Sequence, residues 1–277
     1  MKKIIFAFAL VAGLASCTKE ASVATTENAQ MSEISFVMEG DLDFTVTRAA
    51  AVTTLDSFNV LAENGTPAQV WSLTEVTKSG SNYNTGKMWP STDQQYSFYA
   101  SNISLSYNTA GTTVSPSNAE TDVVVAYSAY SAANYRQAVP LTFNHIFARV
   151  GKVTIPAPAG YSIEVSEVKI NGGTAGTYNL KDNAWTAKSE ASYKALHVGD
   201  NDLYIVPNDC LISVTYTLTK GDYVKTFTKT GTVSIAQGQI NNITATPTIV
   251  GDEGASDIVF TVSLTPWGSK DHSLDLN

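Results

Sequence analysis

The sequence predicts an all-β fold made of two β-sandwich domains. Apolar and polar side chains alternate in many short segments, and turn-forming pairs such as Asn64-Gly65 and Gln237-Gly238 separate these segments. After the first twenty residues, no stretch carries an apolar stripe of 3.6-residue period, which argues against helical crossovers and a parallel α/β sheet. About a dozen predicted strands are too many for one compact sandwich, so two are favoured.

Composition excludes several other classes of protein. The 277 residues are 43% hydrophobic and 15% charged, which does not fit a disordered chain or a coiled coil. Two cysteines are too few for a disulfide scaffold. A formal net charge of −8 argues against binding to nucleic acid, because that affinity depends on lysine and arginine neutralising phosphates.

The first residues predict export. Lys2 and Lys3 precede an uncharged, mostly apolar run over residues 4–14, which at about 1.5 Å per residue is too short to cross a bilayer core of about 30 Å. Its end, Leu14-Ala15-Ser16-Cys17, resembles a bacterial lipobox. We expect residues 1–16 to be a lipoprotein signal peptide and Cys17 to carry lipid that anchors the chain in the outer membrane. The alternative is an ordinary signal peptide that ends near a cysteine.

The expected strands follow a polar tether at residues 18–32. Alternation begins at Ile34 and continues through Val46. The later candidate strands cover residues 57–62, 69–77, 95–100, 122–127, 141–155, 163–170, 202–206, 211–219, 223–235, 240–249 and 258–264. Residues 211–235 are expected to form a hairpin around Gly221. An Ala-, Ser- and Tyr-rich stretch at 128–138 is the predicted junction between an N-terminal sandwich at 49–138 and a C-terminal sandwich at 139–277.

No catalytic or metal-binding constellation is present in the sequence. The three histidines are dispersed without metal-ligand spacing, and neither a nucleophile elbow nor a phosphate loop occurs. We therefore predict no enzyme activity, no cofactor and no metal. Two polar segments, 199–202 and 251–254, could hold calcium, but such segments are usually solvated turns. His145 is expected to be a hydrogen-bonded strand histidine and Cys210 a small buried hydrophobe.

Three segments together resemble the fimbrillin-like (type V pilin) family of Gram-negative anaerobes. The first contains Met88-Trp89-Pro90 and the aromatic run at residues 96–100. The second is the strand at residues 141–150, whose pattern is close to L-x-F-x-H-x-x-A-[KR]-V. The third combines the lipobox with Thr47-Arg48-Ala49. The resemblance covers nearly the whole mature chain, including the late Pro266-Trp267.

The resemblance implies two tandem transthyretin-like β-sandwiches and a route of assembly. An Arg-specific protease would cut after Arg48 and leave Ala49 as the new N-terminus, so that residues 17–48 form a tether and a removable first strand. A C-terminal strand of another fimbrial subunit would then enter the vacated groove. Ile258, Phe260, Val262 and Leu264 share one face of the strand expected to make this donation.

The sequence is compatible with three alternatives. Residues 258–264 could complete their own domain's sheet, with residues 251–257 as a hairpin loop rather than a hinge. The chain could also be a surface lipoprotein adhesin that never polymerises, bound to a host or bacterial receptor. Aromatic platforms for a glycan could come from Trp71, Trp89, Trp185 and Trp267, although core packing explains such residues more simply. A third alternative is the fimbrial anchor subunit, which would keep its lipid and first strand.

Overall fold

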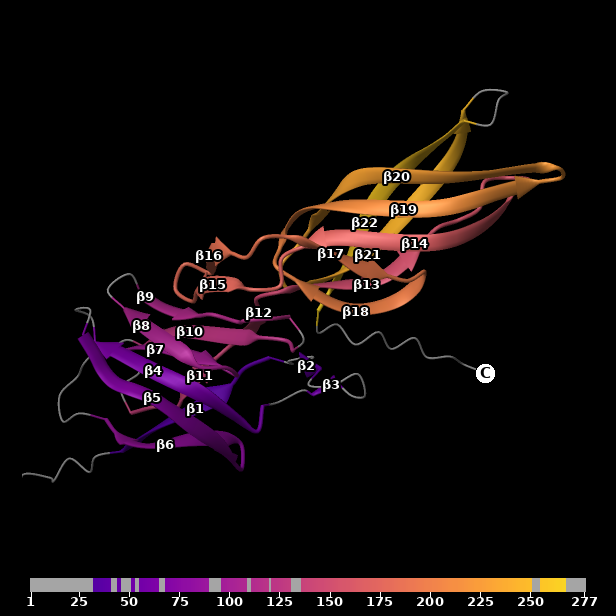
Figure 1. The fold of residues 1–277 in the computed structure, drawn as a ribbon. Helices are drawn as coiled ribbons and strands as arrows, with labels where there is room; N and C mark the ends of the chain where they lie inside the picture. The colour runs from indigo at the N-terminus through magenta and orange to yellow at the C-terminus, as the bar shows by residue number, and fades with distance from the viewer. Residues whose placement is uncertain are drawn as a thin grey trace, which may run out of the picture. The chain divides into compact units, whose positions relative to one another are not determined.

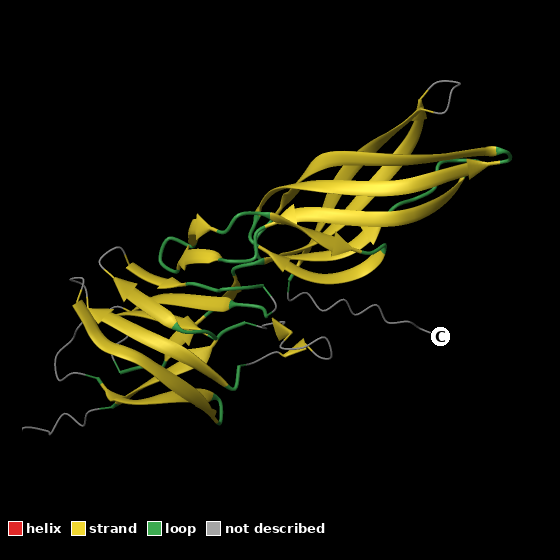
Figure 2. Cartoon of the chain, viewed as in Figure 1, coloured by secondary structure: helices red, strands yellow, loops and turns green. Residues whose placement is uncertain are grey.

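A computed structural model describes residues 32–40, 44–45, 51–52, 55–64, 68–89, 96–108, 111–119, 121–130, 136–250 and 255–267. Across these residues it contains strands and loops and no helix, so the predicted all-β class is confirmed (Figure 2). None of the described elements is a helix long and apolar enough to cross a membrane. Cys17, Arg48 and Ala49 lie outside the described residues.

The first sheet has eight strands in the order β11-β1-β6-β5-β4-β7-β10-β12 (Figure 1). Their bounds are β1 Glu33–Met38, β4 Ser57–Asn64, β5 Ala68–Ser79, β6 Asn82–Met88, β7 Tyr96–Ser101, β10 Val124–Tyr130, β11 Val139–Leu141 and β12 Asn144–His145. Alternation gives this sheet two apolar faces. Val60, Phe98 and Val124 lie in one core cluster, whereas Leu61, Tyr99 and Val125, one residue further along each strand, lie in another.

Four-stranded sheets form the rest of the fold, apart from a short ribbon. The second sheet contains β8 Leu105–Asn108, β9 Gly111–Val114, β15 Gly176–Asn179 and β16 Ala184–Lys188. The third contains β18 Gly199–Ile205, β13 Ala148–Thr154, β21 Gln239–Val250 and β22 Ala255–Pro266, in that order. The fourth contains β17 Ser192–Leu196, β14 Ser162–Gly172, β19 Asn208–Lys220 and β20 Tyr223–Ile235, in that order. The ribbon pairs β2 Phe44–Thr45 with β3 Ala51–Val52.

The third and fourth sheets pack face to face as a sandwich (Figure 1). Their shared core contains Val150 and Ile243 from one sheet and Ile212, Val214 and Tyr216 from the other. The predicted hairpin around Gly221 is confirmed, because β19 and β20 pair without interruption from Asn208–Ile235 to Lys220–Tyr223. Gly221 itself has a φ of 57°, a left-handed conformation that glycine adopts without strain.

The expected single strand at residues 141–155 is wrong, because this run is divided among β11, β12 and β13. Its apolar side chains enter three different clusters, with Leu141 in the first, Phe147 in the second and Val150 in the third. The chain thus changes from the first sheet to the third within a few residues. Because β11 and β12 pair within the first sheet, strand pairing continues past residue 138, and the exact domain boundary stays a prediction.

The segment that begins at Gly199 was expected to be a solvated turn, and it is instead the start of β18. The Asn201 amide is buried and donates to the carbonyl oxygens of Gly151, His197 and Gly199. Among the described residues, no group of three or more His, Cys, Asp or Glu side chains is placed to hold a metal ion.

Candidate functional site

The first described strand, β1, lies inside the first sheet and is paired along both edges. It runs parallel to β11, with Phe36 opposite Val139, and antiparallel to β6, with Phe36 opposite Tyr83. Further hydrogen bonds fix its two ends: Trp89 donates its backbone N–H to Ser32 at 2.9 Å, and Glu39 donates to Leu141 at 3.0 Å. If β1 left the sheet, β6 and β11 would both present unpaired backbone groups to one gap.

The inward face of β1 belongs to the first core. Ile34 and Phe36 are fully buried, and Met38 packs against the same cluster. The Phe36 ring lies 6.1 Å from the Phe58 ring and 5.2 Å from the Phe98 ring, both in edge-to-face geometry. Burial of two such side chains contributes about 1.5–3 kcal/mol each. A gap left by β1 would therefore be lined by aromatic rings.

The last described strand, β22, is the edge strand of the third sheet. It pairs antiparallel with β21 along its whole length, from Ala255–Val250 to Pro266–Gln239. Among the residues predicted as a donor face, Ile258, Phe260 and Val262 are partly buried against the sandwich core. Leu264 is 53% exposed although it shares their parity, and Val259 on the opposite face is 55% exposed. In the monomer, β22 therefore completes its own sheet, held by one neighbouring strand.

Phe260 fits closely against β20. A Cβ atom added at Gly231 would lie 2.3 Å from Phe260 Cδ2, so only glycine leaves room for the ring. Beside this contact lies a cavity of about 300 Å³ between β20 and β22. Thr232, Val233, Ser234, Phe260, Val262 and Leu264 line it. The packing of β22 is thus tight at Phe260 and incomplete toward Leu264.

Trp267 follows β22 directly and lies between two aromatic rings. It is buried and stacks on His145 at 4.1 Å between ring centroids, with an interplanar angle of 5°. Trp267 also stacks on Tyr204 of β18, with 5.4 Å between the ring centroids and an interplanar angle of 11°. His145 lies on β12 and is fixed by a 2.6 Å contact between its Nδ1 and Oδ2 of Asp122. The prediction of a hydrogen-bonded strand histidine is therefore confirmed.

The partner of His145 was not predicted from sequence. Asp122 is fully buried, and burial raises the pKa of its carboxyl, although the hydrogen bond and charge of His145 act in the opposite direction. The two residues are 23 positions apart, and the pairing of β10 with β12 brings their segments together. Sequence alternation alone carries no signal for such a pair.

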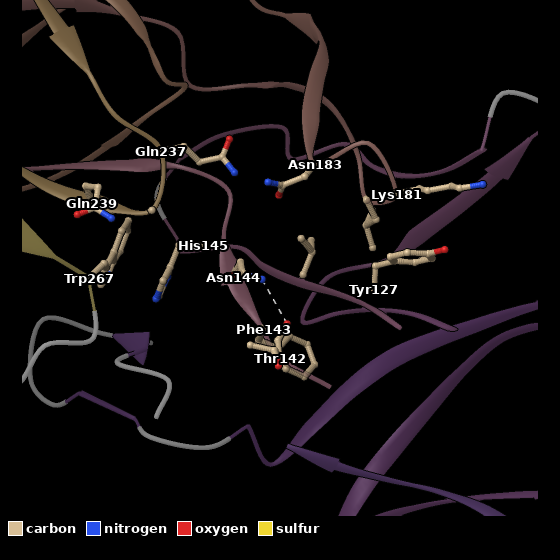
Figure 3. A pocket seen from close by; sticks show the side chains of 13 residues that line it. Tyr127, Thr142, Phe143, Asn144, His145, Lys181, Asn183, Gln237, Gln239 and Trp267 are labelled. Atoms are coloured by element: carbon tan, nitrogen blue, oxygen red, sulfur yellow. Dashed lines mark hydrogen bonds between the residues drawn. The ribbon is translucent and has the colours of Figure 1, made fainter. Parts of the chain in front are cut away.

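A cleft of about 760 Å³ lies beside His145 and Trp267 (Figure 3). Its wall is rich in amides, with Asn144, Asn183, Gln237 and Gln239, and it also includes Lys181. Two of these amides are oriented by the buried Tyr178 hydroxyl, which donates to Asn183 Oδ1 and accepts from Gln237 Nε2 at 2.8 Å. The cleft is a polar surface held in a defined arrangement.

Trp89 and Trp267 are buried in core clusters, which agrees with core packing rather than an exposed platform. Trp185 is partly buried, and its indole N–H donates to the carbonyl oxygen of Ile146 at 3.1 Å. Nothing is described for the Trp71 side chain. Cys210 is also buried, as expected, and burial raises the pKa of its thiol to about 11.

The fold and the two terminal strands define an all-β sandwich protein whose candidate site is built from strands. A sequence model described as fimbrillin-like matches residues 30–267, so the chain belongs to the fimbrillin-like family. A search of curated proteins gave no match.

Solved structures of low sequence identity share the fold. A proposed cell adhesion protein from Bacteroides ovatus is 13% identical with a TM-score of 0.52, over 86% of this chain and 98% of that one. A second proposed cell adhesion protein, from Bacteroides uniformis, is 15% identical with a TM-score of 0.50, and the match covers 85% of this chain and 98% of that one. A fimbrilin from Porphyromonas gingivalis is 11% identical with a TM-score of 0.51, over 87% and 99%.

Proposed function

We propose that the chain is a structural fimbrial subunit that polymerises when β22 of one copy takes the place of β1 in the next. Membership of the fimbrillin-like family supports a pilus-subunit or cell-adhesion-like role at the cell surface, in association with other fimbrial subunits. The observation that carries the finer proposal is the match between the two strands. β1 presents Ile34, Phe36 and Met38 to its core, and β22 presents Ile258, Phe260 and Val262 to its own.

The matching apolar faces of β1 and β22 define which residue of β22 would replace each residue of β1. With Ile258 in the place of Ile34, Phe260 replaces Phe36 beside Phe58 and Phe98, and Val262 replaces Met38. Leu264 then lies at the position of Gly40, two residues past Met38, the last residue of β1 and the one paired with Leu141. Both edges of the gap offer backbone groups, which is the requirement for strand addition.

The consequence is a filament. The donated strand and the accepting gap are different surfaces of one molecule, so the contact is heterologous and each subunit can both give and receive a strand. An open series of such contacts grows without closing. Among the described strands β22 lies at the edge of its sheet, so its departure breaks strand pairing with β21.

Processing supplies the trigger in this proposal. The chain is exported as a lipoprotein, held at the outer membrane through lipid on Cys17, and cut after Arg48 by an Arg-specific protease so that Ala49 becomes the N-terminus. β2 and β3, which pair with each other, lie on either side of this position in the chain. The anchor alternative would retain lipid and β1, and its mature N-terminus would be Cys17.

The test is polymerisation of the purified precursor. Treatment with an Arg-specific protease should yield a chain that starts at Ala49, by mass spectrometry, and SDS-resistant ladders on a gel. Arg48→Ala should abolish both. A chain that is cut after Arg48, loses residues 17–48 and remains monomeric would contradict polymerisation.

That outcome would favour the second candidate, a surface adhesin that does not polymerise. The polar cleft beside Trp267 is the observation that supports it, because oriented amides and a lysine suit hydroxyl and carboxylate groups of a receptor. Both candidates place the chain on the cell surface, and the protease experiment separates them.

A further inference from the structure

Trp267 ends the segment that the proposed function requires to move. It follows Pro266, the last residue of β22. Among the side chains described between residues 256 and 267, two are buried, Ser256 and Trp267, one at each end of the strand. Ser256 shares a 2.7 Å hydrogen bond with the Tyr216 hydroxyl. Between these two ends the apolar face of β22 is only partly buried, and it borders a cavity toward Leu264.

The Trp267 indole stacks on two rings that belong to neither β21 nor β22, and we call this site its seat. His145 comes from β12 of the first sheet, and Tyr204 comes from β18, on the far side of the third sheet from β22. Asp122 holds the His145 ring through a 2.6 Å contact that does not involve Trp267. Neither ring neighbour belongs to β21, the one strand that pairs with β22 among the described residues.

The seat of the Trp267 indole lies at the border of a cleft and includes no hydrogen bond to the indole from the described residues. Trp267 and His145 border the open cleft of about 760 Å³ (Figure 3). The buried indole N–H has no hydrogen-bond partner within the described part of the chain, and an unpaired buried donor weakens the hold. Stacking and burial therefore keep Trp267 in place, without a polar bond that must be broken first.

We propose that Trp267 is a latch: its indole, held between His145 and Tyr204, keeps β22 in its own sheet and must leave this seat before the strand can be donated. The latch rests on the proposed function, because it regulates the same strand. It restrains the end of β22 that carries Leu264, which is the end with the least buried apolar face. In this way the monomer stays unpolymerised until an acceptor gap competes for the strand.

The first experiment needs no polymer. Hydrogen exchange of the uncleaved precursor is followed by mass spectrometry in wild type and Trp267→Ala. We expect exchange of residues 255–266 to rise about tenfold or more, as loss of two aromatic contacts predicts, while residues 208–220 of β19 change less than twofold. Trp185→Ala is the matched control, since it removes an indole that packs against the same cluster but does not follow β22. It should leave residues 255–266 unchanged.

Unchanged exchange of β22 in Trp267→Ala would overturn the latch. If Trp267→Ala does not fold, Trp267→Leu retains apolar volume without the stacked ring and is judged by the same readout.

The second experiment measures ladder formation after protease treatment, which we expect to be at least threefold faster in the variant. A variant with raised exchange that polymerises more slowly than wild type would also overturn the latch. If exchange rises but neither protein polymerises, the proposed function fails while the local hold of Trp267 on β22 stands.

Discussion

At the scale of single residues, packing around β22 depends on one glycine. The Phe260 ring occupies the space that a side chain at position 231 would fill. Interiors packed this closely tolerate extra atoms poorly, because the neighbours must shift or adopt strained rotamers. The pair Gly231 and Phe260 therefore offers a direct measure of how tightly the monomer holds its last strand.

We predict that Gly231→Ala destabilises the monomer by about 1–3 kcal/mol through its clash with Phe260. In a Phe260→Ala background the same change should be neutral or stabilising by about 0.4–1 kcal/mol, since the ring is gone and alanine costs less entropy than glycine. Urea unfolding of the four proteins in this double-mutant cycle measures the coupling. Equal effects of Gly231→Ala in both backgrounds would contradict the contact.

Cys210 predicts a pH dependence of stability. Its thiol ionises near pH 9 in the unfolded chain and near pH 11 in the folded one, because burial raises its pKa. Between these values the unfolded state loses a proton that the folded state keeps, so the free energy of unfolding falls as pH rises. The loss should reach about 2–3 kcal/mol above pH 11. Cys210→Ala should remove this part of the decline in urea unfolding at pH 8–11, and an unchanged decline would contradict the assignment.

At the scale of elements, long alternating strands could be predicted from sequence. The hairpin of β19 and β20 follows from alternation on both sides of Gly221, and β1 follows from Ile34, Phe36 and Met38. The expected continuation of this strand to Val46 is wrong, because β1 ends at Met38 and β2 belongs to a separate ribbon. The short strands β8, β9, β15, β16 and β17 were missed, because four or five residues carry too little alternation to stand out. The division of residues 141–155 depends on three separate cores, which local sequence does not encode.

The two faces of β22 are expected to differ in their effect on polymerisation. Leu264 and Val259 are about equally exposed in the monomer, but only Leu264 shares the face of Phe260. We expect Leu264→Asp to reduce ladder formation, because in the proposed register this position continues the face that Phe260 presents to a neighbour's groove. Val259→Asp, on the outward face, should polymerise within twofold of wild type.

Far-ultraviolet circular dichroism and thermal unfolding of both aspartate variants establish that the monomer still folds. Equal loss of polymer in the two variants would show that the face of β22 does not matter. Equal retention would place Leu264 outside the contact between subunits, and a different register or strand would then be needed.

At the scale of the whole molecule, the proposed polymerisation would bring β22 of one copy into the place of β1 in the next. β1 occupies an inner position in an eight-stranded sheet, and β22 an edge position in a four-stranded one. Loss of the first opens a gap with two unpaired edges, and loss of the second costs pairing with one strand. This asymmetry favours movement of β22 rather than of an inner strand. The sequence pattern indicated both strands, but only the structure places one inside a sheet and the other at an edge.

A cross-link between subunits tests whether β22 of one copy enters the place of β1 in the next. In the proposed register Val259 takes the place of Ser35, which is paired with Asn84 on β6. A chain with Val259→Cys and Asn84→Cys should therefore form disulfide-linked multimers, seen on a non-reducing denaturing gel, after protease treatment and mild oxidation. None should form before treatment, or when Thr230→Cys on β20 replaces Val259→Cys. Absence of linked multimers in a preparation that polymerises would contradict donation of β22 into the place of β1.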